Sequence, residues 1–293
     1  MQGEREPVSP ESTKQYALYM ERLKSAKERY EESLRHKIQY VERLAGMQNI
    51  EPSGETEPWW DVFDSSVSDA PNEERRGYYS RAATKWPSFY GTGGYTDEDI
   101  QKHIKDARER TGKRILAVDL LGQGRQCIEL GADKALATTL FPYRGIHPDV
   151  EQINGDALSA GVSNELFNKI RQAKQNGYSF HIAYFRPISA FLEHRSNLYV
   201  FRTLYDRLRS LYELMDEGGL MFAACSAGQQ HEATLLRKIL SVTGNEGVLL
   251  PNTPANQIAI RKDSSRCARL PLESEILKKF PDILGQLIEL DKI

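Results

Sequence analysis

The stretch RILAVDLLGQG at residues 114–124 decides the predicted fold. An apolar run ends in Asp119, and a turn that contains Gly122 and Gly124 follows at once. In an open α/β sheet the first strand meets its ligand in this way, because glycines let backbone approach closely and the next helix begins with unpaired N–H groups. Two nearby glycines also occur by chance in many loops. The prediction therefore depends on the segments that follow.

Those segments alternate between helical and extended patterns. Helices are predicted over residues 96–110, 124–131, 163–176, 196–215 and 229–241, and strands over 114–119, 134–140, 179–185 and 220–225. Residues 141–155 are interpreted as polar and irregular. The runs 247–251 and 256–261 predict two further strands, antiparallel because the short link between them leaves no room for a crossover. The pattern indicates an α/β fold, with a mostly parallel sheet and helices on both faces.

Four motifs in this order resemble the class I S-adenosylmethionine-dependent methyltransferase family, a Rossmann-like fold, over about residues 97–263. They are AVDLLGQG, INGDAL, LYELMDEGGLMFAA and VLLPNTPANQIAIRKD. The resemblance implies a seven-stranded, mostly parallel sheet with an antiparallel last strand, and S-adenosyl-L-methionine as cofactor. It also implies that Asp156 hydrogen-bonds the adenine amino group. The cofactor-binding residues that follow from it are Asp119, Gly122, Gln123, Gly124, Thr139, Asp156, Ala157 and Tyr184.

The sequence also departs from the family pattern. Leu121, Gln123 and Arg125 stand where the first motif usually has glycines. The second strand usually ends in an acid that binds both ribose hydroxyls, whereas this one ends near Thr139, whose hydroxyl bonds ribose more weakly. The fourth strand ends in YFRP, beginning at Tyr184, which contains no amide or carboxylate for a methyl acceptor. No catalytic residue is assigned.

Each candidate residue also has a purely structural interpretation. Asp119 can cap the next helix, since acids are favoured at helix starts. Asp156 can close an Asx turn or a cap ahead of Leu158. Tyr184, in a buried strand, can be a core residue. His181 and His194 have no partner at metal-ligand spacing, so no metal site is expected.

Three functions remain open. Methyl transfer from S-adenosylmethionine to an unidentified acceptor is favoured, because such a reaction depends mainly on positioning and needs little acid–base chemistry. A catalytically inactive methyltransferase-like module that binds a ligand or partner is the alternative, and the missing acid and displaced glycines favour it. A nicotinamide-dependent oxidoreductase is a weaker third, because that fold also needs the acid and lacks the antiparallel hairpin.

The flanking regions divide the chain further. Residues 1–12 are expected to form a disordered tail, 13–46 a long amphipathic helix, 47–95 an aromatic-rich connector, 96–263 the methyltransferase-like domain and 264–293 a helical tail. The helix is expected to pack on its own domain, with self-association in a coiled coil or docking of a partner protein as the alternatives. The stripe expected to be buried consists of Tyr16, Leu23, Tyr30, Leu34, Ile38 and Val41.

Composition narrows the class of protein. The formal net charge of the 293 residues is -2, which gives no basic nucleic-acid footprint. The three cysteines are far apart, which favours a reducing compartment over a disulfide framework. No apolar run reaches the roughly 18 residues of a membrane span, and the N-terminus lacks a signal-peptide core. We therefore expect a cytoplasmic protein without a membrane partner.

Overall fold

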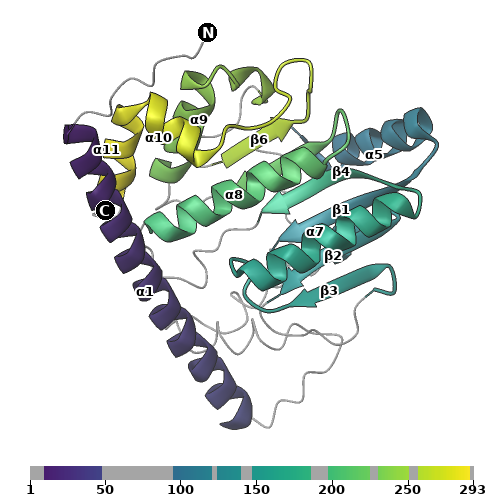
Figure 1. Cartoon of the computed structure of the whole chain (residues 1–293). Helices are drawn as coiled ribbons and strands as arrows, with labels where there is room; N and C mark the ends of the chain where they lie inside the picture. The colour runs from purple at the N-terminus through teal and green to yellow at the C-terminus, as the bar shows by residue number, and fades with distance from the viewer. Residues whose placement is uncertain are drawn as a thin grey trace.

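The computed structural model describes residues 10–47, 95–120, 124–139, 147–185, 197–224, 230–250 and 257–290. It shows an α/β fold built on a mixed sheet with the strand order β3-β2-β1-β4-β5-β6. Helices cover both faces of this sheet (Figure 1). Nearly all of the predicted aromatic connector and the first nine residues lie outside the described residues.

The sheet has six strands within the described part of the chain. They are β1 (Arg114–Leu120), β2 (Lys134–Thr139), β3 (Val150–Asn154), β4 (Tyr178–Phe185), β5 (Leu220–Ala224) and β6 (Gln257–Arg261). The first five run parallel to one another, and β6 pairs antiparallel with β5. The carboxyl ends of β1 to β5 therefore lie at one edge, called here the carboxyl edge. The prediction of a mostly parallel sheet with an antiparallel last strand is confirmed.

The predicted count of seven strands is wrong for the described residues. The run 247–251 begins in a 3₁₀ turn, Glu246–Val248, and then forms only an isolated bridge between Leu249 and Ile260. The N–H of Leu250 donates to the carbonyl of Ala259 at 2.9 Å. The next residue is Pro251, which has no N–H to extend a ladder. As far as Leu250, where the described residues stop, this run adds only that bridge to the sheet.

The interpretation of residues 141–155 as irregular is wrong for residues 150–154, which form β3. Its sequence VEQIN is short and polar, and the strand lies at the sheet edge beside β2. Glu151 forms ion pairs with Lys134 of β2, at 2.6 Å, and with Lys169, at 2.5 Å. An edge strand can carry such charges because one of its sides remains open to solvent.

The helices alternate with the strands along the chain. After the long α1 (Pro10–Met47), they are α5 (Asp97–Thr111), α6 (Arg125–Glu129), α7 (Ala160–Gln175), α8 (Leu198–Leu214), α9 (Gln230–Val242), α10 (Glu273–Lys279) and α11 (Pro281–Leu290). Helix α5 begins in a capping box, in which Thr96 accepts from the N–H of Asp99 and the Asp99 carboxylate accepts from the N–H of Thr96.

The core lies in two layers, one on each face of the sheet. Alternate residues of β1 divide between them: Leu116 and Val118 pack with α7, α8 and α1, whereas Ile115 and Ala117 pack with α5 and α6. This alternation follows from the two-residue period of a strand. Because both faces are covered, the central strands are apolar almost throughout.

Helix α1 packs against α8 and α11 of the same chain. Its buried residues are Tyr19, Leu23, Ala26 and Tyr30, at spacings of three or four that place them on one face. Tyr16, expected in the buried stripe, is 50% exposed, and the side chain of Val41 is outside the described residues. The opposite face carries exposed i,i+4 ion pairs, such as Lys24–Glu28 and Lys27–Glu31.

Asn197 connects α1 to the first turn of α8. Its side-chain oxygen accepts from the N–H of Val200 at 3.1 Å, and its amide donates to the carbonyl of Ala26 at 3.0 Å. We expect Asn197→Ala to lower the free energy of unfolding by about 1–2 kcal/mol, because a helix cap and an interhelical hydrogen bond are lost together. Urea denaturation measures this. Asn197→Asp keeps the cap acceptor but not the amide donor, so its free energy of unfolding should lie between those of the wild type and Asn197→Ala.

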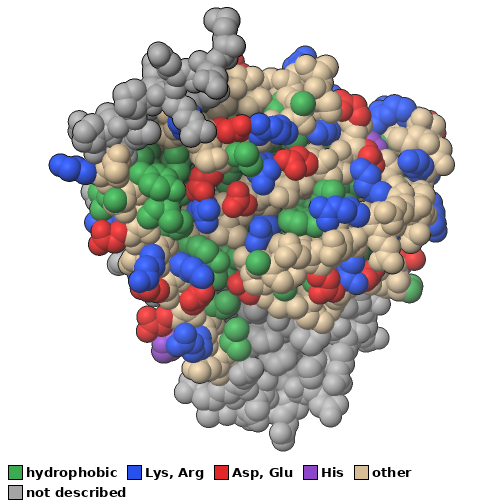
Figure 2. Space-filling model, viewed as in Figure 1, with side chains coloured by type: hydrophobic (Ala, Val, Ile, Leu, Met, Phe, Trp, Pro, Cys, Tyr) green, Lys and Arg blue, Asp and Glu red, His purple; other side chains and the backbone are tan. Residues whose placement is uncertain are grey.

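On the face shown in Figure 2, Lys and Arg side chains alternate with Asp and Glu side chains. This distribution agrees with the near-zero net charge of -2. In the described part of the chain, no helix combines the length and apolarity that crossing a bilayer requires.

Candidate functional site

The order of the strands indicates where a ligand would bind. From the central strand β1, the chain places β2 and β3 on one side, and β4, β5 and β6 on the other. Such a change of direction opens a crevice outside the carboxyl ends of the two central strands, because their connections leave on opposite faces. Here the central strands are β1 and β4, and Asp119 lies opposite Tyr184 in their register.

Asp119 is fully buried and closes the turn after β1. Its Oδ2 accepts a hydrogen bond from the N–H of Gly124 at 2.9 Å, and Gly124 is the N-cap residue just before α6. Gly124 has φ of +72°, a conformation that glycine adopts without strain. Asp119 thus binds the N–H of the N-cap residue of α6 and ties the end of β1 to the start of that helix. Gly122 and Gln123 lie outside the described residues.

The ends of β2 and β3 are joined by their side chains. Thr139 Oγ1 donates to Asn154 Oδ1 at 3.0 Å, and the N–H of Gly155 donates to the carbonyl of Thr139 at 2.8 Å. Thr139 is buried and Asn154 is exposed. Asn154 was not among the predicted site residues, although it lies two positions before Asp156 in the INGDAL motif. Its exposed amide adds a hydrogen-bonding group to the carboxyl edge.

Asp156 follows β3 and is held by two donors on one oxygen. Its Oδ1 accepts from the N–H of Leu158 at 2.9 Å, which is the predicted Asx-type turn, and from the Tyr30 hydroxyl at 2.7 Å. Arg207 of α8 donates to the carbonyl of Leu158 at 3.1 Å and so fixes the same loop. Burial lowers the pKa of the Arg207 guanidinium, against the neighbouring Asp206. Ala157, another predicted site residue, is buried within this loop.

Tyr184 lies in the core layer beneath α5 and α6. Its ring stacks on Phe222, with centroids 5.8 Å apart and planes 21° apart, and only 4% of the residue is exposed. This environment matches the structural interpretation of Tyr184. The geometry therefore brings Asp119, Thr139 and Asp156 to one edge of the sheet and gives Tyr184 a packing role.

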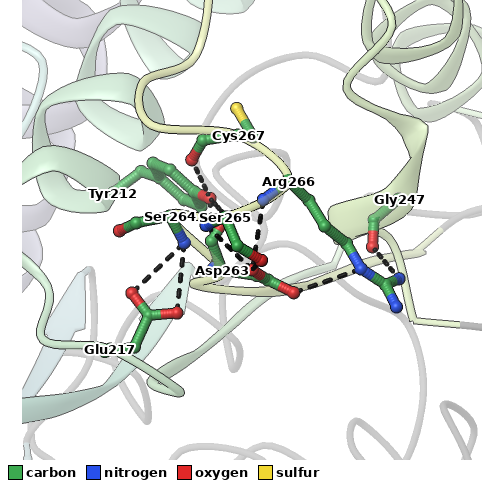
Figure 3. A network of polar contacts seen from close by, with 8 residues as sticks. All are labelled: Tyr212, Glu217, Gly247, Asp263, Ser264, Ser265, Arg266 and Cys267. Atoms are coloured by element: carbon green, nitrogen blue, oxygen red, sulfur yellow. Dashed lines mark hydrogen bonds and ion pairs between the residues drawn. The ribbon is translucent and has the colours of Figure 1, made fainter.

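A second polar cluster lies at the opposite edge, in the turn after β6 (Figure 3). Asp263 accepts from the backbone N–H groups of Ser265 and Arg266, and Glu217 accepts from the N–H of Ser264. Tyr212 donates to the carbonyl of Cys267 at 2.8 Å. Because β6 is antiparallel, this turn lies at the amino ends of the parallel strands, away from the crevice. These contacts stabilise a turn.

The described residues contain no group of three His, Cys, Asp or Glu side chains placed to hold a metal ion. The polar groups described at the carboxyl edge are the Asp119 and Asp156 carboxylates, the Asn154 amide, the Thr139 hydroxyl and nearby backbone amides. Such groups suit the hydrogen-bonding edges of a nucleoside.

Comparisons with known proteins gave distant structural similarities. No protein-family model matches the sequence, and no curated protein matches it. Among solved structures, the chain is similar to the MycE methyltransferase of the mycinamycin biosynthetic pathway, in complex with Mg and SAH, with a TM-score of 0.34 and 12% identity. That match covers 64% of this chain and 55% of MycE, so the chain spans about half the length of that protein.

Two structures of the StiE O-MT are also similar. Residues 942–1257 of that protein match with a TM-score of 0.21 and 11% identity, covering 83% of this chain and 76% of the other. Residues 961–1257 match with a TM-score of 0.22 and 12% identity, covering 81% and 78%. At these scores the similarity carries no functional argument, and the site is argued from its own geometry.

Proposed function

We propose that this chain binds S-adenosylmethionine at the carboxyl edge and transfers its methyl group to an acceptor. The observation that carries the proposal is the pair Asp119 and Asp156 at one edge of a sheet whose strand order reverses between β1 and β4. A crevice at such a point is where open α/β sheets bind nucleotide-type ligands. The antiparallel β6 beside β5 supports the methyltransferase-like arrangement over a nicotinamide-binding one.

The residues present suit the parts of this cofactor. The Asp156 carboxylate is a hydrogen-bond acceptor for the adenine amino group. Asn154 and Thr139 offer an amide and a hydroxyl toward ribose, and Asp119 stands at the carboxyl end of β1, where the methionine portion would lie. The cofactor supplies an activated methyl group on a sulfonium. The protein has to hold that group in line with the acceptor atom, and most of the rate enhancement comes from this positioning.

A second candidate is a methyltransferase-like module that binds a ligand or partner without chemistry. One contact favours it: the Thr139 hydroxyl, which stands where an acid would hold ribose, donates to Asn154 at 3.0 Å. A site that lacks a bidentate acceptor holds ribose less firmly. Docking of a partner protein on the outer face of α1 belongs to this second proposal.

Isothermal titration of the full chain with S-adenosylhomocysteine tests both candidates. We expect saturable one-to-one binding, with NADH giving no heat under the same conditions. Conversion of labelled S-adenosylmethionine in the presence of fractionated acceptor pools then separates an enzyme from a binding module. Absence of binding at millimolar ligand would contradict the proposed cofactor site, and tight NADH binding would favour the oxidoreductase.

Substitution of Asp156 tests the placement of the ligand. We expect Asp156→Ala to weaken S-adenosylhomocysteine binding a few-fold, or about 1 kcal/mol, because one hydrogen bond to the adenine amino group is lost. Asp149→Ala is the matched control, since Asp149 is an exposed acid just before the opposite end of β3. Equal dissociation constants for the wild type and both variants would show that the ligand binds elsewhere.

A further inference from the structure

Helix α1 reaches the proposed site from outside the sheet. It lies on the side to which the arrows of β1 to β4 point (Figure 1). Tyr30, near the middle of α1, donates its hydroxyl to Asp156 Oδ1 at 2.7 Å across 126 positions of sequence. The buried face of α1 therefore does more than cover apolar surface, because its Tyr30 contacts Asp156, a residue proposed to bind the adenine.

The Tyr30 side of its contact with Asp156 is buried, whereas Asp156 itself is half-buried. Tyr30 is only 5% exposed, and it packs in a small cluster with Leu158 and Val200. Its ring lies 5.4 Å from that of Tyr199, centroid to centroid. Burial, together with the Asp156 carboxylate, raises the pKa of Tyr30 far above its usual value of 10. The hydroxyl therefore keeps its proton and acts as a hydrogen-bond donor throughout the physiological range.

Two donors on one oxygen fix the orientation of the Asp156 carboxylate. The N–H of Leu158 and the hydroxyl of Tyr30 both bind Oδ1, and among the described residues no side chain donates to Oδ2. The plane of the carboxylate is set by these contacts, so the acceptor direction of Oδ2 is set before a ligand arrives. Pre-organisation of this kind improves affinity because less freedom is lost on binding.

The rest of α1 is anchored independently of Asp156. Tyr19 donates to Glu273 of α10, and Arg202 of α8 binds the same carboxylate at 2.8 Å. Asn197 holds the carbonyl of Ala26. Loss of the Tyr30 hydroxyl alone therefore leaves the helix docked, and its effect on the ligand is separable from its effect on the helix.

We infer that Tyr30 is a positioning residue that orients Asp156 toward the adenine amino group, which makes helix α1 a structural part of the ligand site. The inference rests on the proposed function. It assigns to α1 a role in the selection of an adenine over a base with a carbonyl at the same position. A carboxylate held in place accepts from an amino group and repels a carbonyl oxygen.

The test measures this selection directly. Full-length wild type, Tyr30→Phe and Tyr19→Phe are titrated with S-adenosylhomocysteine and with S-inosylhomocysteine, in which a carbonyl oxygen replaces the amino group. The wild type is expected to prefer the adenosyl compound. In Tyr30→Phe that preference falls about three- to tenfold, which corresponds to the net contribution of one ordinary hydrogen bond. Melting temperatures of all three proteins report whether the helix remains docked.

Tyr19→Phe is the matched control, because it removes a hydroxyl–carboxylate contact of the same helix at a distance from Asp156. It is expected to lower the melting temperature at least as much as Tyr30→Phe while the preference for the adenosyl compound stays at the wild-type value. An unchanged preference in Tyr30→Phe, or an equal loss in Tyr19→Phe, overturns the inference and leaves the proposed function standing. Failure of the wild type to bind either compound overturns both.

Discussion

Gly124→Ala is expected to lower the free energy of unfolding by about 3 kcal/mol, through two effects that add. The residue has φ of +72°, which an L side chain rarely adopts. A Cβ at this position would also lie 2.8 Å from Val150 Cγ1 and 3.2 Å from the Cβ of Ala137. These side chains belong to β3 and β2, so the start of α6 and the face of the sheet would have to move apart.

Gly112→Ala separates the two effects. Gly112 ends α5 with φ of +66°, and a Cβ there meets nothing within 4 Å. It should therefore cost only the backbone strain, about 1 kcal/mol. Guanidinium denaturation of both variants gives the difference. If the two variants lose equal stability, the close approach of Gly124 to Val150 adds nothing to the cost of a Cβ at position 124.

Gly124→Ala should also weaken binding at the proposed ligand site. The N–H of Gly124 is the donor that Asp119 accepts, so displacement of this residue disturbs the turn after β1. We expect Gly124→Ala to weaken S-adenosylhomocysteine binding more than Gly112→Ala does. Gly124 is thus required by its close packing against β2 and β3.

The sheet was predictable because its central strands carry a strong pattern. Residues of β1, β4 and β5 are buried on both faces, and such strands read as short apolar runs bounded by turns. The outer parts of the sheet were harder to predict from the sequence. The polar VEQIN of β3 depends on Lys134 and Lys169, which lie far from Glu151 in sequence. The strand predicted at 247–251 is reduced to a bridge at Leu249.

The candidate site was likewise predictable only in part. The motifs located Asp119 and Asp156, and their local contacts, to Gly124 and Leu158, follow from neighbouring residues. Tyr30 carried no such signal, because its partner lies 126 positions away and its own pattern only indicated an amphipathic helix. A contact of that kind arises from tertiary packing, which a single sequence does not specify. The ligand-binding roles of the predicted residues stay predictions.

A buried pair of histidines is expected to make the protein sensitive to mild acid. β4 has one extra residue, His181, between those that pair with Leu116 and Ala117 of β1. Its ring is fully buried and lies 6.0 Å, centroid to centroid, from that of His103 in α5. Within the described residues, the two ring nitrogens of His181 have no hydrogen-bond partner, and the Nε2 of His103 has none either. These nitrogens therefore have no hydrogen bond among the described residues that would stabilise a positive charge.

The two histidines have depressed pKa values for related reasons. Burial lowers the pKa of His181 from 6.5 to about 4, with Arg110 and Lys174 acting in the same direction and Asp216 opposing them. Burial also lowers the pKa of His103 to about 4, and His181, Arg261 and Arg110 add to this effect while Asp106 opposes it. Both rings are therefore neutral in the folded protein at pH 7.

The sign of the effect follows from proton uptake. The unfolded chain takes up protons near pH 6.5 and the folded protein only near pH 4, so this stability is fully present above pH 6.5 and is lost as the pH falls toward 4. Between pH 7.5 and 5 the loss is roughly 2 kcal/mol per histidine. Guanidinium denaturation at pH 7.5, 6 and 5 should show a total fall of roughly 4 kcal/mol.

His181→Phe replaces the buried ring with one that cannot take up a proton. The fall in stability between pH 7.5 and 5 should then drop by half, to about 2 kcal/mol, because only His103 still titrates. Stability at pH 7.5 should change little, since the ring nitrogens of His181 lose no hydrogen bond. His231→Gln, at an exposed position of α9, should keep the full wild-type fall. If His181→Phe keeps it as well, the acid sensitivity arises from other groups, and the extra residue in β4 serves only to fill space beneath α5.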